Sequence, residues 1–355
     1  MQDSERTKKN ILVAPLNWGL GHATRCIPII KALIDSHYNP ILASDGVALA
    51  LLQKEFPELQ TLEFPSYHIE YPKNGKYFKL KMLLNSPRMI SAILRERKLV
   101  RKVVALHNID GIISDNRLGV RSRKVPSVFI THQLKVLTGN TTWLSTKMHQ
   151  YIINQFDECW VPDVNTIPNL SGKLGHLEKD PKNVKYIGPL SRLQKRKATS
   201  KYNLMVILSG PEPQRTLLEE KLTLELDNYQ GSILFIKGKI EPKQMVTEKN
   251  QFTFYNYMNS GQLERAFNES ELILCRSGYT TIMDLAYLGK KAFLIPTPGQ
   301  YEQEYLAKKF KEEGIAPSCK QEKFKLSKLN KVALYRGFSN SSSALKWKDL
   351  FAVFQ

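Results

Sequence analysis

Short runs of consecutive apolar residues alternate along this chain with longer segments in which apolar residues recur every three or four positions. The first pattern is typical of buried strands in a parallel sheet, and the second is typical of amphipathic helices. Strands are predicted at residues 10–15, 40–43, 62–64, 111–114, 127–130, 159–161, 186–187, 204–208, 232–237, 252–255, 272–274 and 292–295. Helices are predicted at residues 26–33, 49–56 and 343–354, and another ends within 100–107. Strands alternating with helices predict an α/β fold whose parallel sheets are covered on both faces.

One polar and basic segment, GPLSRLQKRKATSKYN at residues 188–203, interrupts this alternation and is typical of a linker. A length of 355 residues also favours about two domains. We therefore predict two doubly wound, Rossmann-like domains, 1–190 and 204–335, joined by a linker at 191–203 and facing each other across a cleft. The remaining residues, 336–355, are expected to form a terminal helix that is free to pack back on the first domain.

Two glycine-bearing turns, residues 16–25 and 275–284, occupy equivalent places in the two predicted domains. Each follows a predicted strand and precedes a predicted helix. Such a turn directs backbone N–H groups and the positive end of a helix toward an anion. Because ligands of doubly wound sheets bind at the carboxyl ends of the strands, the two turns predict a cleft for a phosphorylated substrate.

Composition and charge narrow the class of partner. The formal net charge of +19 favours a polyanionic partner such as nucleic acid, an anionic membrane or a phosphorylated substrate. The chain has no nucleic-acid-binding motif, so nucleic acid is not expected. Four scattered cysteines without CxxC spacing suggest neither a zinc site nor a disulfide framework. The polar first ten residues, and the lack of an apolar stretch of ~20 residues, lead us to expect a cytoplasmic protein, soluble or peripheral.

Residues 271–307, ELILCRSGYTTIMDLAYLGKKAFLIPTPGQYEQEYLA, resemble the C-terminal half of family 28 glycosyltransferases. The shared pattern is a strand, an Arg-Ser-Gly turn, a helix with an acidic residue, a strand ending in proline and a polar pair. The Gly-x-Gly-His-x-x-Arg stretch at 19–25 also resembles this family, as well as the nucleotide-sugar hydrolase of pseudaminic acid biosynthesis. The resemblance implies the two-domain GT-B fold and a nucleotide-sugar donor.

The resemblance also implies donor contacts in the second domain. They come from Ser209, Gly210, Arg215, Met258, Arg276, Ser277, Gly278, Thr280, Thr281, Asp284, Gln303 and Glu304. In the family the acidic residue accepts hydrogen bonds from the ribose, which favours that role for Asp284; the alternative is a first-turn acid stabilised by the helix dipole. Gln303 and Glu304 stand where the family contacts the donor sugar, or else they simply begin an exposed helix.

Two further loops of the second domain complete the implied donor site. Pro211-Glu212-Pro213 removes two N–H donors from the loop after residues 204–208, and Arg215 is expected to supply positive charge instead. Tyr257 and Met258 follow another strand, where the family presents backbone groups to the nucleobase. An apolar loop packed under the base is the alternative reading.

Three residues at predicted strand ends of the first domain have the chemistry of a general base. His22 follows Gly19 and Gly21, and its imidazole titrates near neutrality, so it could accept the proton of an acceptor hydroxyl. Asp115 could orient that imidazole, or could instead cap a helix. His132 is a third candidate, for acceptor or sugar contact. Asn17, Trp18, Gly19 and Gly21 are expected to line the cleft.

The segment 88–104 predicts a helix with one basic and one apolar face. Its basic residues are Arg88, Arg95, Lys98 and Lys102, and its apolar residues are Met89, Ile93, Val100 and Val104. Such a helix can lie on an anionic membrane, where each basic residue adds ~1 kcal/mol of binding. It can equally pack its apolar face on the protein core and expose the basic face.

Together these features predict an inverting glycosyltransferase that uses a UDP-sugar and a membrane-associated or lipid acceptor. No DxD-type pair follows a strand, so neither a metal nor another cofactor is expected. A nucleotide-sugar hydrolase or epimerase on the same fold is the first alternative. A non-catalytic basic scaffold that binds nucleic acid or an anionic surface is the second. The sugar, the acceptor, the nucleobase and the oligomeric state stay open.

Overall fold

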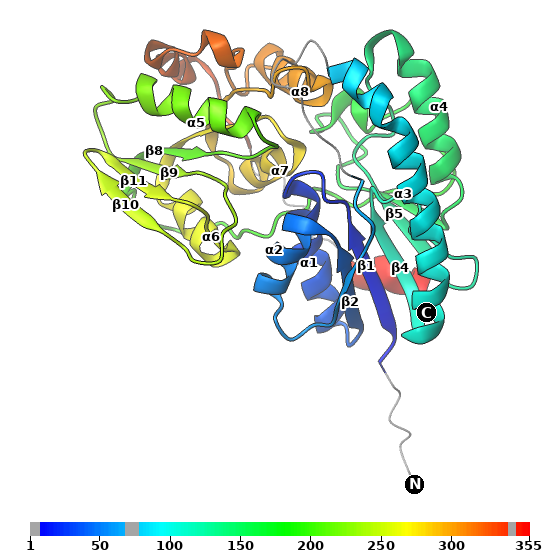
Figure 1. The fold of residues 1–355 in the computed structure, drawn as a ribbon. Coiled ribbons are helices and arrows are strands. Elements are labelled where there is room, and N and C mark those ends of the chain that lie inside the picture. Colours follow the sequence, from blue (N-terminus) through cyan, green and yellow to red (C-terminus); the bar gives the residue numbers. More distant parts are fainter. Residues whose placement is uncertain (1–7, 68–77, 340–345) are drawn as a thin grey trace.

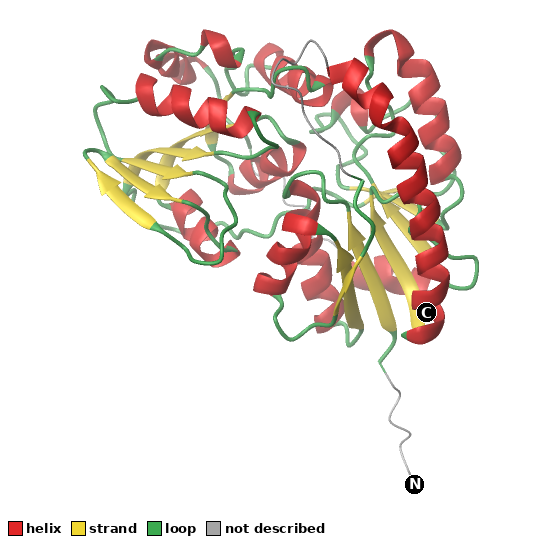
Figure 2. Cartoon of the chain, in the orientation of Figure 1, coloured by secondary structure: helices red, strands yellow, loops and turns green. Residues whose placement is uncertain are grey.

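The computed structural model describes residues 8–67, 78–339 and 346–355, which form two α/β lobes side by side (Figure 1). The first lobe contains a seven-stranded sheet and the second a six-stranded sheet. Helices cover both sheets (Figure 2). The predicted class, two doubly wound α/β domains, is therefore confirmed.

Every neighbouring pair of strands in the first sheet is parallel, and the strand order is β3-β2-β1-β4-β5-β6-β7. The strands are β1 (Asn10–Pro15), β2 (Asn39–Ser44), β3 (Thr61–Glu63), β4 (Ile109–Asp115), β5 (Ser127–Ile130), β6 (Glu158–Val161) and β7 (Val184–Tyr186). The order reverses between β1 and β4, and this switch point is where a doubly wound sheet opens a crevice for ligand.

Helices on the two faces of this sheet contact alternate residues of β1. Ile11 and Val13 pack in the cluster that contains α1 (Gly21–Asp35) and α2 (Gly46–Glu55). Leu12 and Ala14 pack in the cluster that contains α3 (Phe78–Leu106). The central strand is thus buried on both sides, which is why it is an uninterrupted apolar run. Helix α4 (Thr142–Ile153) lies farther along the chain, between β5 and β6, and directly follows the short 3-10 turn η2 (Gly139–Thr141); a second such turn, η3 (Gly172–Leu174), follows β6.

The second sheet repeats this plan in the order β10-β11-β9-β8-β12-β13. Its strands are β8 (Tyr202–Ile207), β9 (Ile233–Ile236), β10 (Val246–Lys249), β11 (Phe252–Tyr255), β12 (Ser270–Cys275) and β13 (Lys291–Leu294). Its helices are α5 (Gln214–Glu225), α6 (Ser260–Asn268), α7 (Tyr279–Leu288) and α8 (Tyr301–Glu312), followed by the 3-10 turns η4 (Gln321–Lys323) and η5 (Leu326–Leu334). The switch point here lies between β8 and β12, so each sheet presents its crevice at its own first strand.

Each strand predicted from the sequence overlaps a strand of the structure, whereas β10 and α4 were not predicted. All four residues of β10 are exposed, and it pairs antiparallel to β11 at the sheet edge, so no apolar pattern marks it. Strand β8 begins at Tyr202, inside the segment 191–203 that we expected to be linker throughout, because Tyr202 is buried.

The end of the chain packs on the first lobe. Helix α9 (Trp347–Phe351) and the 3-10 turn η6 (Ala352–Phe354) place Phe351 5.7 Å from the ring of Tyr38 and 6.4 Å from that of Trp160. A Cβ at Gly111 would lie 2.4 Å from Phe354, so β4 needs glycine there. The start of the predicted helix, residues 343–345, lies outside the described residues. In the described part of the chain, no helix has the length and apolar character needed to cross a bilayer.

Candidate functional site

A cavity of about 770 Å³ lies between the lobes at the carboxyl ends of both sheets. The first lobe contributes the turn after β1 and the segments after β4 and β5. The second lobe contributes the loops after β8 and β11 and the start of α7. The turns at residues 16–25 and 275–284, 250 residues apart in the sequence, thus meet at one cavity.

The first-lobe turn brings His22 to the cavity. Gly19 has a φ of +80°, a backbone conformation that glycine adopts without strain, and α1 begins two residues later. This places His22 in the first turn of α1, with 13% of its side chain exposed. Trp18, Gly19 and Gly21 line the cavity as predicted. Asn17 does not, because its Nδ2 donates to Asp45 at the start of α2 (3.0 Å), and this part of the prediction is wrong.

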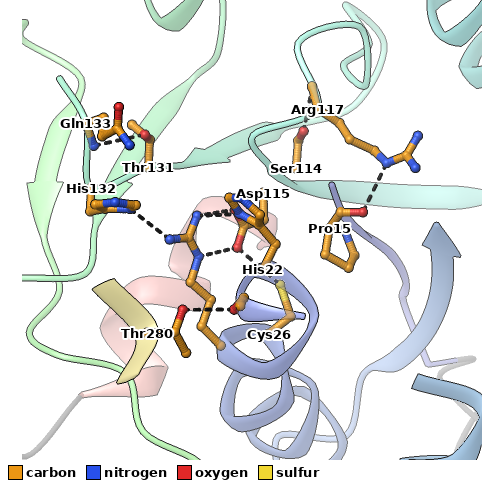
Figure 3. A network of polar contacts seen from close by, with 12 residues as sticks. Pro15, His22, Cys26, Ser114, Asp115, Arg117, Thr131, His132, Gln133 and Thr280 are labelled. Carbon is orange, nitrogen blue, oxygen red and sulfur yellow. Dashed lines mark hydrogen bonds and ion pairs between the residues drawn. The ribbon is translucent and has the colours of Figure 1, made fainter. Parts of the chain in front are cut away.

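His22 and Asp115 form the pair expected of a base and its orienting carboxylate (Figure 3). Nδ1 of His22 lies 2.8 Å from Oδ1 of Asp115, which ends β4 and is fully buried. Burial lowers the pKa of His22; the Asp115 carboxylate raises it and Arg25 lowers it, and the net effect is a lowered pKa. Burial raises the pKa of Asp115, but Arg25 and then His22 bring it down to about 2. The pair therefore combines a carboxylate with an imidazole that is neutral at pH 7.

His132 connects this pair to the second lobe. It follows β5, and its ring stacks on that of Tyr279 in α7 with a centroid distance of 4.2 Å and an interplanar angle of 3°. Its Nδ1 lies 2.9 Å from Arg25, and its Nε2 lies 3.0 Å from Oε1 of Glu302 in α8. Gln133 donates to the other oxygen of Glu302. Residues of both lobes thus complete a single polar cluster.

The second-lobe turn presents the amino end of α7. Its N-cap residue, Gly278, has no side chain to occupy the first N–H groups of the helix. These N–H groups lack partners within the helix, so they are available to an anion. Gly278, Thr280 and Thr281 line the cavity, and Oγ1 of Thr280 donates to the carbonyl oxygen of Gly21 (3.0 Å). The amino ends of α1 and α7 therefore converge on the same space.

Asp284 also lines the cavity, one turn further along α7. Its Oδ1 accepts a hydrogen bond from Ser191 (2.7 Å). Burial raises the pKa of Asp284 to about 6, in spite of nearby Arg192 and the Ser191 hydrogen bond. A buried carboxylate with a second oxygen to offer suits vicinal hydroxyl groups.

Arg192 is a cavity residue that the sequence analysis missed. It lines the cavity beside Asp284, and its Nε and one terminal nitrogen are buried without a hydrogen-bond partner within the described chain. A buried guanidinium with unused donors is suited to an anionic ligand. Its position in an irregular linker carries no periodic signal that could have revealed it.

The loops after β8 and β11, also expected at the donor site, both contribute residues to the lining of the cavity. Ser209 and Gly210, after β8, line it, as do Tyr257 and Met258, after β11. Gly210 has a φ of +99°, and a Cβ there would meet only Thr297, at 3.7 Å. The Ser209-Gly210 loop thus borders the cavity with small residues and backbone.

Three residues predicted to bind donor lie away from the cavity lining. Arg215 is held by Glu212 and Glu219, whose carboxylates neutralise its charge. Arg276 is fully buried and donates to the carbonyl oxygens of Gln214 (2.8 Å) and Pro296 (3.1 Å); burial lowers its pKa to about 9. Ser277 donates to the carbonyl oxygen of Gln303 (2.8 Å). These side chains hold the loops together outside the cavity lining, and their contact with the donor stays a prediction.

The predicted polar pair, Gln303 and Glu304, is shifted by one residue. Gln303 lines the cavity, but Glu304 is exposed and accepts from the N–H of Gly299 (3.0 Å). The acid at the cavity is Glu302 instead. Residues two apart on a helix point about 200° apart, so only one of the two glutamates can face inward.

The basic helix packs its apolar face on the protein. Val100 and Val104 are buried in the core, whereas Arg88, Arg95, Lys98 and Lys102 are exposed. The same helix also exposes Ile90 and Leu94, and α4 exposes large apolar side chains. Those of α4 are Trp143, Leu144, Met148 and Tyr151, with relative exposures of 68%, 52%, 60% and 71%.

Comparisons with known proteins agree with this architecture. Residues 213–348 match the model of the glycosyltransferase family 28 C-terminal domain. An uncharacterized glycosyltransferase of Methanosarcina mazei is 25% identical over 323 residues, which are 83% of this chain and 82% of the relative. The UDP-N-acetylglucosamine–N-acetylmuramyl-(pentapeptide) pyrophosphoryl-undecaprenol N-acetylglucosamine transferase of Clostridium tetani is 23% identical, covering 87% of this chain and 86% of its own.

The same fold occurs among solved structures. The crystal structure of the glycotransferase of kitacinnamycin aligns with a TM-score of 0.63 at 14% identity and covers 98% of this chain and 94% of its own. The family 28 resemblance is thereby confirmed. This chain is a glycosyltransferase of the GT-B fold, with a second lobe of the family 28 C-terminal type.

Proposed function

We propose that the protein transfers a sugar, with inversion, from a nucleotide diphosphate donor, a UDP-sugar, to an acceptor hydroxyl. The observation that carries this proposal is the shared cavity. His22 of the first lobe, with Asp115 behind it at 2.8 Å, and the amino end of α7 of the second lobe border one space of about 770 Å³. A base and an anion site on opposite walls suit a direct displacement at an anomeric carbon.

The donor would lie mainly against the second lobe. Its diphosphate would meet the N–H groups at the start of α7 and the Ser209-Gly210 loop, and Arg192 would add a guanidinium. Asp284 would accept from the ribose. Glu302 and Gln303 would contact the sugar, because carboxylate and amide groups hydrogen-bond well to hydroxyls.

His22 would act on the acceptor. Because its Nδ1 faces Asp115, the other ring nitrogen, Nε2, is left to accept the proton of the attacking hydroxyl. The hydroxyl oxygen then forms a bond to the anomeric carbon as the bond to the diphosphate oxygen breaks on the opposite side. The positive ends of α1 and α7, together with Arg192, would stabilise the departing diphosphate, and metal independence is proposed on that basis.

The acceptor side of the cavity favours an acceptor with an apolar part. The first-lobe wall includes the apolar side chains of Leu16, Tyr67, Met89, Leu118, Val136 and Leu137. A water molecule needs no such wall, so transfer is favoured over the alternative of nucleotide-sugar hydrolysis. An acceptor with both a hydroxyl and a hydrocarbon region matches the combination of His22 and these residues.

We further propose that this acceptor is a membrane lipid, reached from the cytoplasmic side by a face formed by α3 and α4. Arg121 interacts electrostatically with Arg97 of α3 and with Tyr151 of α4, so these parts of the two helices lie near each other. Their exposed side chains combine apolar groups, such as Leu94 and Trp143, with basic groups such as Arg95 and Lys147. Apolar insertion together with attraction to anionic headgroups is the pattern of peripheral membrane binding. The relative in Clostridium tetani is named for an undecaprenol-linked acceptor.

A donor screen with product analysis tests the transferase proposal. Purified protein is incubated with UDP-, TDP- and GDP-sugars, with and without a polar lipid extract, and the nucleotide, free sugar and glycolipid are quantified. We expect nucleotide release that depends on lipid and matches glycolipid formed. Equal release without lipid, with free sugar as the product, would identify a hydrolase.

Vesicle co-sedimentation tests the membrane face. The W143S/M148S variant is expected to lose binding to vesicles containing anionic lipid, while L224S, which removes an apolar side chain of 78% exposure from α5 in the second lobe, is expected to bind normally. Unchanged binding of W143S/M148S would contradict this assignment.

A further inference from the structure

Arg25 occupies the centre of the polar cluster at the cavity, although the sequence analysis gave it no role. It lies one helical turn after His22 on α1 and is only 2% exposed. Its Nε and one terminal nitrogen donate to the two carboxylate oxygens of Asp115, in a bidentate pair. Such planar, two-bond pairing fixes both partners in orientation as well as in charge.

The same guanidinium also contacts both histidines. One terminal nitrogen lies 2.9 Å from Nδ1 of His22, a contact rather than a hydrogen bond in the tautomer whose Nδ1–H donates to Asp115. The other terminal nitrogen lies 2.9 Å from Nδ1 of His132, which has no carboxylate beside it. Arginine has donors only, so Nδ1 of His132 must accept, and the proton of a neutral His132 lies on Nε2. That nitrogen faces the Glu302 carboxylate at 3.0 Å. Arg25 therefore sets the orientation of the residue that joins the two lobes.

The arrangement differs from a simple carboxylate–histidine pair. A buried carboxylate with no other cation nearby favours the protonated imidazole, which cannot accept a proton. Here the negative charge of Asp115 is already balanced by the positive charge of Arg25. Nδ1 of His22 lies 2.8 Å from Oδ1 of Asp115, the oxygen to which Arg25 also donates. The Asp115 carboxylate can still orient the His22 ring, but it stabilises a positive charge on the imidazole less than an unpaired carboxylate would.

We propose that Arg25 is a positioning residue that neutralises Asp115 and so keeps His22 in the uncharged form able to accept a proton. The proposal rests on the proposed role of His22 as the base. The charged and titratable groups close to His22 come from each element around it: Arg25 from α1, Asp115 from β4, His132 after β5 and Glu302 from α8. Of these, Arg25 alone is a permanent cation.

The direction of the pKa shifts agrees with this geometry. Burial lowers the pKa of His22 most strongly, Asp115 raises it and Arg25 lowers it. Removal of the Arg25 charge leaves the Asp115 effect uncompensated, so the pKa of His22 must rise. The fraction of neutral His22 near pH 6 then falls, and the acidic limb of kcat/KM moves to higher pH.

A set of four variants tests this charge balance: R25M, D115N, the double variant R25M/D115N and R25K. The titration of His22 is followed by NMR of ring-labelled histidine, with the His22 signal assigned by its loss in H22Q. We expect R25M to raise the pKa of His22 and D115N to lower it. The double variant should titrate higher than D115N but lower than R25M, and R25K should stay close to wild type. If R25M does not fold, the comparison of D115N with the double variant still isolates the effect of Arg25.

R117M is the matched control. Arg117 is also fully buried in the first lobe and is paired with Asp45 and Glu96, but it does not line the cavity. It should lose stability without altering the titration of His22. For R25M we also expect the ratio of kcat/KM at pH 6 to that at pH 8.5 to fall about tenfold.

The outcomes distinguish the proposed role of Arg25 from the proposed role of His22 as the base, on which it rests. An unchanged His22 titration in R25M, or an equal shift in R117M, would overturn the role of Arg25. Full turnover in H22Q would instead show that His22 is not the base, while the NMR titrations would still report whether Arg25 controls its charge.

Discussion

The two lobes share one backbone plan but border the cavity with different chemistry. In both, the first strand of a doubly wound sheet ends in a glycine-bearing turn or loop at the switch point. The first lobe places His22, Arg25 and His132 there, and the buried carboxylate of Asp115 bonds His22 and Arg25 from behind. The second lobe places there the amino end of α7, the Ser209-Gly210 loop and two carboxylates, Asp284 of α7 and Glu302 of α8.

This difference teaches how one architecture supports two tasks. A cluster of buried, mutually bonded ionisable groups can tune a proton acceptor, because each charge shifts the pKa of its neighbours. A helix end with small residues offers fixed dipoles that bind an anion without titrating. The fold alone does not distinguish these tasks; the side chains after each strand do.

The largest expected effect comes from removal of the proton acceptor in the first lobe. H22Q should lower kcat/KM by about 10²–10⁴-fold, since general-base catalysis contributes that much, while UDP binding stays unchanged. Steady-state kinetics and calorimetric titration with UDP provide the two readings.

H176Q is the control for that variant. His176 also pairs with a buried aspartate, Asp163, at 3.3 Å, but it lies outside the cavity lining. It should retain near-normal kcat/KM. Equal losses in the two variants would mean that His22 matters only for folding.

The second prediction contrasts two glutamates on α8. E302Q should lower kcat/KM by about 10–100-fold, because a charged hydrogen-bond partner of the sugar and of His132 is lost. E304Q should have little effect, because Glu304 is exposed and lies away from the cavity. A greater loss in E304Q would mean that Glu304 contacts the sugar, as the family pattern implies, and would contradict the assignment of that contact to Glu302.

The third prediction concerns the carboxylate of the second lobe. D284N should weaken UDP binding about tenfold through loss of a charged acceptor for the ribose. The pKa of Asp284 is raised to about 6 by burial, so its carboxylate gains a proton as the pH falls through 6. Wild-type affinity should therefore decline below pH 6 more steeply than that of D284N, which lacks this titrating carboxylate. Parallel pH curves for the two proteins would rule out ribose recognition by this residue.

The smallest effect is expected at the contact between the two turns. A Cβ at Gly21 would lie 3.0 Å from Oγ1 of Thr280, whose hydroxyl bonds the Gly21 carbonyl. G21A should reduce kcat/KM a few-fold by forcing the lobes slightly apart. G21A/T280S should not recover the loss, because serine keeps the hydroxyl oxygen that the new Cβ would meet. No change in G21A would show that the turns need not approach this closely during turnover.

Much of the fold was predictable because parallel strands buried on both faces appear as apolar runs. Ile11 to Ala14 contact helices on alternate faces, and every position is apolar. The strand β10 shows the limit of this logic, since an exposed edge strand needs no such run.

The site was predictable only where a residue's place along the chain determines its direction. His22 and Thr280 follow directly from strand–turn–helix junctions. The sequence did not reveal that nearby carboxylates and carbonyls take up the donors of Arg215 and Arg276 and hold both side chains outside the cavity lining. Arg25 was overlooked for a related reason: its role depends on a contact with Asp115, which lies 90 residues away in the sequence.

Diffraction from crystals soaked with UDP tests the division between the lobes most directly. The account predicts density for the diphosphate against the first turn of α7, with the ribose within hydrogen-bond distance of Asp284 and the β-phosphate facing His22 across the cavity. Nucleotide density bound to the first lobe, with α7 and Asp284 uncontacted, would contradict it.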